Sequence, residues 1–174
     1  EIVFIGKLKR FGESRNIDFL LKGMTFLDAS YTLKIVGADE SEIVDLNEIS
    51  KNLGLESRVT ILGRVGYSDV AKQLSSSSIG ILINSSMNKH STSYTSPLKY
   101  FEYLAARLKV IAVDFPSHRE LPFSDKITFF QDGNIESLVS AINELDYLDI
   151  LDTNVLSSIS LETRAKKIID FLSY

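Results

Sequence analysis

The 174-residue sequence contains no cysteine and only two histidines, His90 and His118. Disulfide bonds and thiolate metal sites are therefore excluded, and two histidines alone do not make a typical zinc site. No apolar run approaches the roughly 18 residues that a membrane-spanning helix needs, and no signal peptide is visible. The chain must therefore fold around an apolar core without disulfide bonds or a thiolate metal site.

The charge balance argues against a further class of protein. The chain has 19 basic and 23 acidic residues, a net charge of −4, which argues against a nucleic-acid footprint over the whole chain. Apolar residues make up 44% and charged residues 24%, ordinary values for a soluble globular domain. The sequence enters a strand-like run almost at once, and we expect it to be a piece of a longer protein.

Short β-rich runs alternate with helical patterns along the chain. Apolar runs predict six strands, at residues 2–5, 33–36, 58–62, 79–83, 110–113 and 127–130. Helical spacing predicts helices over residues 15–26, 42–53, 67–75, 96–106, 135–145 and 160–172, with a short one within 115–121. This alternation predicts an α/β fold, a Rossmann-like three-layer sandwich. Its six-stranded parallel sheet has helices on both faces and, as we expect, the strand order 3-2-1-4-5-6.

The functional prediction depends most on the helix predicted over residues 96–106. Ser96 can cap its first N–H groups, and Pro97 suits the first helical position. Four apolar residues at helical spacing are expected to face the core: Leu98, Phe101, Leu104 and Ala105.

Lys99 and Glu102 lie three residues apart on another face of this helix. A helix N-terminus attracts phosphate. The helix therefore offers a phosphate-binding site, a lysine and a carboxylate that can accept hydrogen bonds from hydroxyl groups. The plainer alternative is an ordinary capped amphipathic helix with an ion pair between these two residues.

The predicted strand order places a ligand crevice beyond the carboxyl ends of the first and fourth strands. Lys7, Lys9 and Arg10 follow the first strand, and a polar loop and the 96–106 helix follow the fourth. These cations are therefore expected to face Glu102 and the helix N-terminus across one crevice. We predict a phosphorylated ligand whose sugar hydroxyls reach Glu102.

Three common phosphate-binding classes fit poorly. Gly6 and Gly12 do not have the G-x-G-x-x-G spacing of dinucleotide sites, which leaves Asp39 and Glu40 as a weak ribose signal. There is no G-x-x-x-x-G-K-[ST] loop. Phosphoreceiver domains need acidic residues where this chain has Lys7.

Several short motifs follow one another in a characteristic order. They are F-I-G-K-L at residues 4–8, R-N-I-D-F-L-L at 15–21, L-K-I-V-G at 33–37, L-G-L at 53–55, R-V at 58–59, L-G at 62–63, S-P-L-K-Y-F-E-Y-L-A-A at 96–106, and the final helix at 161–172. Together they resemble the C-terminal, donor-binding half of retaining GT-B glycosyltransferases of the group called family 4 or group 1. The resemblance covers essentially the whole chain and implies a preceding acceptor half that is absent here.

The resemblance also implies site residues. Two basic residues that contact the donor diphosphate in the family match Lys7, beside Gly6, and Arg15, with a slightly longer spacing here. The second glutamate of the family's E-x₇-E signature matches Glu102 and is implied to hold the ribose. The first glutamate matches Tyr94, which is a departure from the family.

Main-chain groups complete the implied site. Those meeting the diphosphate or sugar lie near Tyr94, Thr95 and Ser96, with Lys99 on the following helix. The turn that contains Arg64 and Val65 is implied to hold the base. The nucleoside-diphosphate sugar is a substrate, and no metal or other cofactor is expected, because cations and helix N-termini stabilise the leaving diphosphate.

The resemblance thus implies that residues 1–174 are the donor domain of a retaining glycosyltransferase acting on a hydroxyl of a glycan, a lipid-linked glycan or a cell-surface polysaccharide. The expected partners are the donor and the absent N-terminal acceptor half, with no nucleic acid and no membrane contact from this domain. We expect a cytoplasmic protein, peripheral to the membrane through the absent half. The isolated domain is expected to be inactive. Two alternatives stay open: a non-catalytic nucleotide- or partner-binding module of the same fold, and a GT-B-like nucleotide-sugar epimerase.

Overall fold

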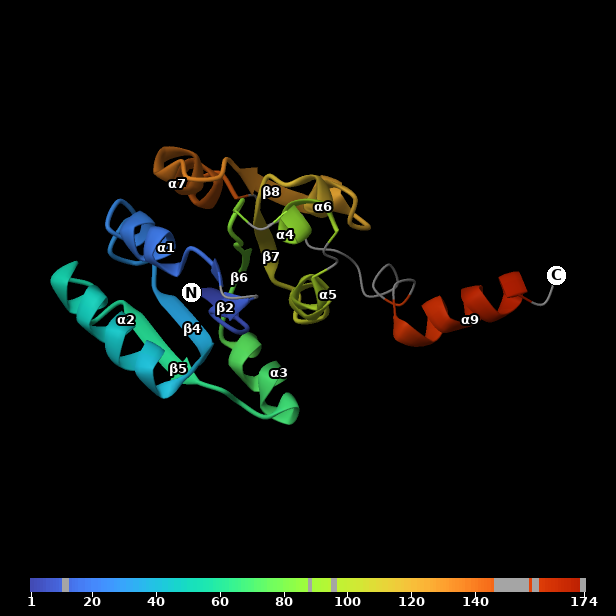
Figure 1. The fold of residues 1–174 in the computed structure, drawn as a ribbon, viewed down its shortest axis with the longest axis horizontal. Helices are drawn as coiled ribbons and strands as arrows, with labels where there is room; N and C mark the ends of the chain where they lie inside the picture. The colour runs from blue at the N-terminus through green and yellow to red at the C-terminus, as the bar shows by residue number, and fades with distance from the viewer. Residues whose placement is uncertain (11–12, 88, 95–96, 146–156, 158–159, 173–174) are drawn as a thin grey trace.

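The computed structural model describes residues 1–10, 13–87, 89–94, 97–145, 157 and 160–172 (Figure 1). Thr95, Ser96 and the stretch 146–156 lie outside the described residues.

A six-stranded parallel sheet in the order β5-β4-β1-β6-β7-β8 forms the centre of the molecule (Figure 1). The strands are β1 (Ile2–Ile5), β4 (Leu33–Ala38), β5 (Val59–Gly63), β6 (Ile79–Leu82), β7 (Lys109–Val113) and β8 (Ile127–Phe130). In order of appearance along the chain this is 3-2-1-4-5-6, which confirms the predicted topology. The winding reverses between β1 and β6, where a doubly wound sheet forms its ligand crevice.

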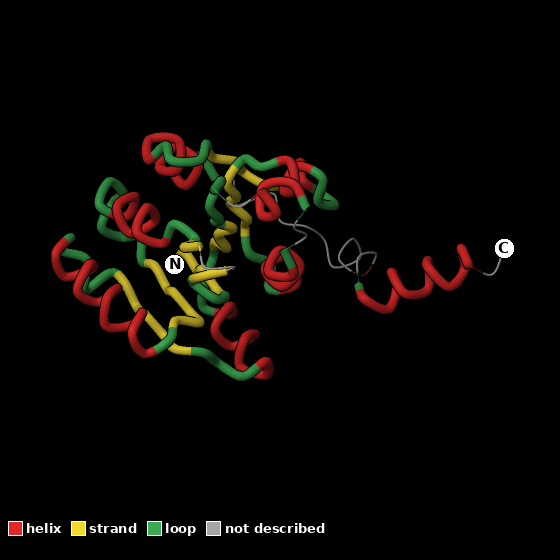
Figure 2. Tube along the Cα trace, in the orientation of Figure 1, coloured by secondary structure: helices red, strands yellow, loops and turns green. Residues whose placement is uncertain are grey.

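Helices cover both faces of the sheet (Figure 2). On one face, α1 (Ile17–Met24), α2 (Glu40–Asn52) and α7 (Ile135–Asn143) contribute to one buried apolar cluster. On the other face, α3 (Tyr67–Ser75) and α5 (Leu98–Ala105) contribute to a second cluster. In β1, Ile2 and Phe4 belong to the first cluster and Val3 and Ile5 to the second. Side chains alternate across a strand, so a doubly covered strand must be apolar throughout.

The remaining elements are short or peripheral. A two-stranded antiparallel ribbon pairs β2 (Lys9–Arg10) with β3 (Glu13–Ser14). The other elements are α4 (Lys89–Ser93), α6 (Pro116–Arg119), η1 (Ser124–Lys126) and α9 (Leu161–Leu172), where α6 and α9 confirm predicted helices. The sequence did not predict the ribbon, α4 or η1, because elements of two to five residues are too short to show a hydrophobic period.

Capping fixes the ends of α2. The Glu42 N–H donates to Asp39 Oδ1 at 2.9 Å, and the Asp39 N–H donates to Glu42 Oε2 at 2.9 Å, a complete capping box. The helix therefore begins at Glu40, two residues before the predicted start. It ends before Gly54, whose φ of +68° confirms the predicted glycine stop.

The predicted details of α5 need correction. The helix begins at Leu98, and Pro97 precedes it with an extended backbone instead of occupying the first helical position. Leu98 is 70% exposed and Ala105 is also exposed, so neither faces the core as expected. Tyr100 and Tyr103 are fully buried in their place.

Several other element boundaries differ from the prediction by one or two residues, and two of them lie next to the candidate site. The first helix begins at Ile17, so Arg15 lies before α1 and not within it. Gly37 does not end β4, which continues to Ala38 across an irregularity in its pairing with β5.

Candidate functional site

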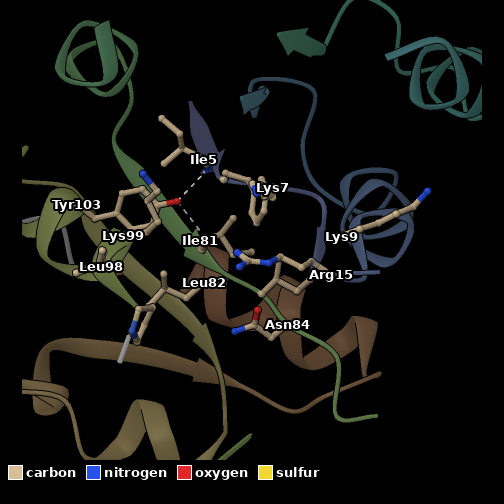
Figure 3. A pocket seen from close by; sticks show the side chains of 14 residues that line it. Ile5, Lys7, Lys9, Arg15, Ile81, Leu82, Asn84, Leu98, Lys99 and Tyr103 are labelled. Carbon is tan, nitrogen blue, oxygen red and sulfur yellow. Dashed lines mark hydrogen bonds between the residues drawn. The ribbon is translucent and has the colours of Figure 1, made fainter. Parts of the chain in front are cut away.

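A pocket of about 620 Å³ lies where the carboxyl ends of β1 and β6 meet the start of α5 (Figure 3). Gly6 and Lys7 follow β1, Asn84 follows β6, and Lys99 belongs to the first turn of α5. Ile5 and Leu82, at the ends of the two strands, contribute to the apolar part of its lining. The pocket therefore occupies the predicted crevice at the reversal of the winding.

Basic side chains dominate the polar lining of this pocket. Among the described residues that line it, four are basic and none is acidic. The basic residues are Lys7, Lys9, Arg15 and Lys99. Figure 3 shows Lys7, Arg15 and Lys99 around the pocket, whereas the end of the Lys9 side chain extends away from the other three. A concentration of positive charge on a chain of net charge −4 is suited to an anionic ligand.

The β2–β3 ribbon brings Lys7 and Arg15 to the same pocket. The chain leaves β1, turns through the ribbon and returns, so that the Arg15 N–H donates to the Leu8 carbonyl at 2.9 Å. Gly6 has a φ of +147°, and a Cβ built on it would lie 3.4 Å from Nη1 of Arg15. The glycine therefore lets the guanidinium lie close to the end of β1.

The N-terminus of α5 faces the pocket, because Pro97, Leu98 and Lys99 all belong to its lining. The first N–H groups of an α-helix have no partner within the helix, and the helix dipole adds positive potential there. This end of α5 therefore reinforces the preference of the four cations for an anion.

Glu102 does not share this lining. Its carboxylate Oε2 lies 2.8 Å from Lys99 Nζ, and the residue lines a second cavity of about 330 Å³ between α3 and α5, together with Tyr67, Val70 and Leu74. The expectation of one cleft containing Lys7 and Glu102 is therefore wrong in this detail. Residues three apart on a helix are offset by about 60° around its axis, so Lys99 faces β1 while Glu102 faces α3.

Asp39 follows β4 at the same edge of the sheet. The Glu42 N–H and the Ser41 hydroxyl donate to its carboxylate and hold its pKa below the ordinary value of 3.8, and Lys9 and Arg64 add a smaller electrostatic contribution. The Asp39 side chain therefore acts as a helix cap in this structure.

The described residues contain neither a candidate metal cluster nor a candidate membrane-spanning helix. In the part of the chain that the structure describes, no group of three or more histidine, aspartate or glutamate residues is arranged to hold a metal ion. None of the described helices combines the length and apolar character required to span a membrane.

The family described as Glycosyl transferases group 1 matches residues 1–146. The chain belongs to this family. No curated protein sequence matches it significantly.

Solved glycosyltransferase structures share the fold of this group 1 family member. Anabaena HepE in complex with UDP superposes with a TM-score of 0.70 at 17% identity, over 98% of this chain and 48% of HepE. The lipopolysaccharide outer core galactosyltransferase WaaB gives 0.67 at 17% identity, over 97% of this chain and 47% of WaaB. A glycosyltransferase from Rickettsia africae superposes with a TM-score of 0.62 at 20% sequence identity, over 98% of this chain and 43% of that protein. The fold is that of GT-B glycosyltransferases, and the chain spans about half the length of these structures.

The described pocket lining does not include three further residues implied by the family resemblance: Arg64, Val65 and Tyr94. Arg64 is exposed, and Val65 packs against the core cluster that contains α3 and α5. Tyr94, which follows α4, is 73% exposed. Of the predicted binding residues in this group 1 domain, the structure brings together Gly6, Lys7, Arg15 and Lys99.

Two polar residues of the described pocket lining were not predicted from the sequence, Asn84 and Tyr103. Asn84 is buried, and its carbonyl accepts a hydrogen bond from Asn16 Nδ2 at 3.3 Å. Its position as the first polar residue after an apolar strand was a usable signal. Tyr103 gave no such signal, because a tyrosine within an amphipathic helix is usually a core residue.

Proposed function

We propose that this chain is the donor-binding part of a glycosyltransferase that binds a nucleoside-diphosphate sugar and transfers the sugar with retention of configuration. The observation that carries the proposal is the convergence of Lys7, Arg15, Lys99 and the α5 N-terminus on one pocket at the reversal of the sheet. A diphosphate is the anion that best matches several cations distributed around one cavity.

The proposed chemistry depends on charge. When the glycosidic bond to the diphosphate breaks, negative charge develops on the leaving group, and preorganised cations stabilise it most strongly in a site shielded from water. We assign Gly6, Lys7 and Arg15 to the diphosphate, together with Lys99 and the main chain near Thr95 and Ser96. We propose that this requires no metal ion.

The nucleoside would then extend past Lys99 toward the groove between α3 and α5. Glu102 lines that groove, and we assign it to the ribose hydroxyls, from which its carboxylate would accept hydrogen bonds. The turn with Arg64 and Val65 precedes α3, and we assign it to the base. The complex of Anabaena HepE with UDP makes UDP the first nucleotide to test.

Transfer also requires an acceptor hydroxyl held against the anomeric carbon, and positioning accounts for much of the rate of such reactions. The similar structures are about twice as long as this chain. We propose that a further half of the protein supplies the acceptor site, and that an acceptor of the glycan, lipid-linked glycan or polysaccharide type binds there.

Calorimetric titration of the chain with UDP, GDP, ADP and inorganic pyrophosphate tests the binding function. We expect one nucleoside diphosphate to bind with 1:1 stoichiometry and more tightly than its nucleoside. Absence of binding by all four ligands would overturn the proposal.

A second candidate function is a non-catalytic nucleotide-binding module. Tyr94, at the position of the family's first signature glutamate, favours it, because this substitution removes a carboxylate implied to approach the donor. Donor turnover by this chain joined to an acceptor half distinguishes the two. Binding without any transfer would support the module.

A further inference from the structure

The two central strands separate beneath the pocket. Strand β1 pairs with β4 as far as Ile5, and β6 pairs with β7 as far as Leu82. The pairing between β1 and β6 ends earlier, at Val3 and Gly80. The seam between these two strands is therefore open over the residues that form the floor of the pocket.

A tyrosine hydroxyl occupies this seam. If the β1–β6 register continued, the Ile5 N–H would donate to the Ile81 carbonyl, as in any parallel ladder. Instead, the Ile5 N–H donates to Tyr103 Oη at 3.1 Å, and the Tyr103 O–H donates to the Ile81 carbonyl at 3.3 Å (Figure 3). The phenol is thus inserted between the donor and the acceptor of one ladder bond.

The surroundings of Tyr103 suit this role. A Cβ built on Gly80 would lie 2.4 Å from the Tyr103 ring, so only glycine leaves room for the ring against β6. Complete burial raises the pKa of Tyr103 above its ordinary value. The hydroxyl therefore stays neutral and can donate and accept at once.

Tyr103 also connects the strands to the cations. Lys7 lies two residues after Ile5, and Lys99 lies one helical turn before Tyr103 on α5. Both lysines line the pocket, as does Tyr103 itself. The hydroxyl therefore fixes the end of β1, the end of β6 and the first turns of α5 relative to one another.

We propose that Tyr103 is a positioning residue, whose hydroxyl holds β1 and β6 apart so that Lys7 and Lys99 are spaced for a diphosphate. The inference rests on the proposed donor-binding function. Without the hydroxyl, the seam between Ile5 and Ile81 would close and displace the end of β1, or it would stay open with a buried N–H and a buried carbonyl unpaired. In the second case the end of β1 is held less firmly.

The test compares Tyr103→Phe with Tyr100→Phe. Tyr100 is an equally buried tyrosine of the same helix, and its hydroxyl donates to the Pro122 carbonyl at 2.6 Å, away from β1 and β6. Both variants keep the ring and lose one buried hydroxyl. Affinity for UDP and for inorganic pyrophosphate is measured by calorimetry, and the free energy of unfolding by urea titration.

We expect Tyr103→Phe to lower the affinity for both ligands about tenfold, as for supporting residues of other preorganised sites. Tyr100→Phe should lose comparable stability and keep its affinity. Equal affinities of wild type and Tyr103→Phe would overturn the inference while leaving the donor-binding function intact. Absence of binding by the wild type would overturn that function instead.

Amide hydrogen exchange gives a second readout that needs no ligand. In Tyr103→Phe the Ile5 amide should exchange at least about tenfold faster relative to Val3, since only the Ile5 N–H loses its acceptor. An unchanged ratio would show that the hydroxyl does not hold the seam. Gly80→Ala, which displaces the Tyr103 ring but keeps the hydroxyl, should reproduce the loss of affinity.

Discussion

Lys99 Nζ and Glu102 Oε2 form an ion pair of 2.8 Å, although the two residues line different cavities. Both side chains are partly exposed, so this pair contributes little to folding stability. Its importance is that it joins the basic pocket to the groove between α3 and α5. A phosphate that attracts Lys99 would free the Glu102 carboxylate for hydroxyl groups in the groove.

Glu102→Gln should weaken UDP binding by about tenfold or more, because a hydrogen bond to a charged group contributes about 1.5–3 kcal/mol. Binding of inorganic pyrophosphate should stay the same or tighten, since Lys99 is released toward the pocket. The melting temperature should change little. Calorimetry with both ligands checks this, and unchanged UDP affinity in a folded variant would make Glu102 a purely structural residue.

Lys7→Ala should reduce the affinity for UDP far more than the affinity for uridine, because the Lys7 charge is directed at phosphate. The wild-type affinity for UDP should fall as salt is added, and the variant should show a weaker salt dependence. Lys22→Ala is the matched control, because Lys22 is exposed in the last turn of α1. Equal losses for nucleoside and diphosphate would contradict the assignment of Lys7.

Gly37→Ala should destabilise the fold by several kcal/mol. Gly37 has a φ of +112°, and a Cβ there would lie 2.4 Å from the Gly6 carbonyl oxygen, so backbone strain and a clash combine. Gly54→Ala is the control, because Gly54 has a φ of +68° but no atom within 4 Å of the added Cβ. The control should cost only about 1 kcal/mol. Urea unfolding of both variants measures the difference, and equal costs would reject the clash.

His118 should make the fold less stable at mildly acidic pH. Burial lowers its pKa below the ordinary value of 6.5, against smaller opposing effects of the Val113 carbonyl, which accepts from Nδ1 at 2.7 Å, and of Asp114. Below about pH 6.5 the unfolded chain binds a proton that folded His118 resists, so the free energy of unfolding falls as the pH drops. Above pH 7.5 the side chain is neutral in both states and has no such effect.

The effect of His118 is measured as the free energy of unfolding between pH 7.5 and 5.5. This pH range lies above the pKa values of most carboxylates. The slope should reach at most about 1.4 kcal/mol per pH unit for this one proton. His118→Phe should flatten the curve. A variant with the wild-type slope would show that other groups cause the pH dependence.

The parallel sheet was predictable because each apolar run is long enough to show its character and because the runs alternate with helices. The strand order was predictable because 3-2-1-4-5-6 is a common order of doubly wound sheets. Two cations at the pocket were predictable from their positions, since Lys7 lies two residues after a strand and Lys99 lies in the first turn of a helix. The direction in which Glu102 points was not predictable, because a sequence gives the spacing of residues along a helix but not the rotation of the helix about its axis. The role of Tyr103 was not predictable either, because it depends on a gap between two strands that lie far apart in the sequence.

The β2–β3 ribbon brings together residues on either side of it, whatever the length of chain between them. Leu8 and Arg15 are joined across the base of an antiparallel pair, so residues added symmetrically to its two strands extend the tip and leave the base in place. Extra length between Lys7 and Arg15 would be accommodated in this way. Evolution can therefore vary the length of this segment while the two cations keep their positions, and an engineered loop could be grafted at the tip with the same freedom.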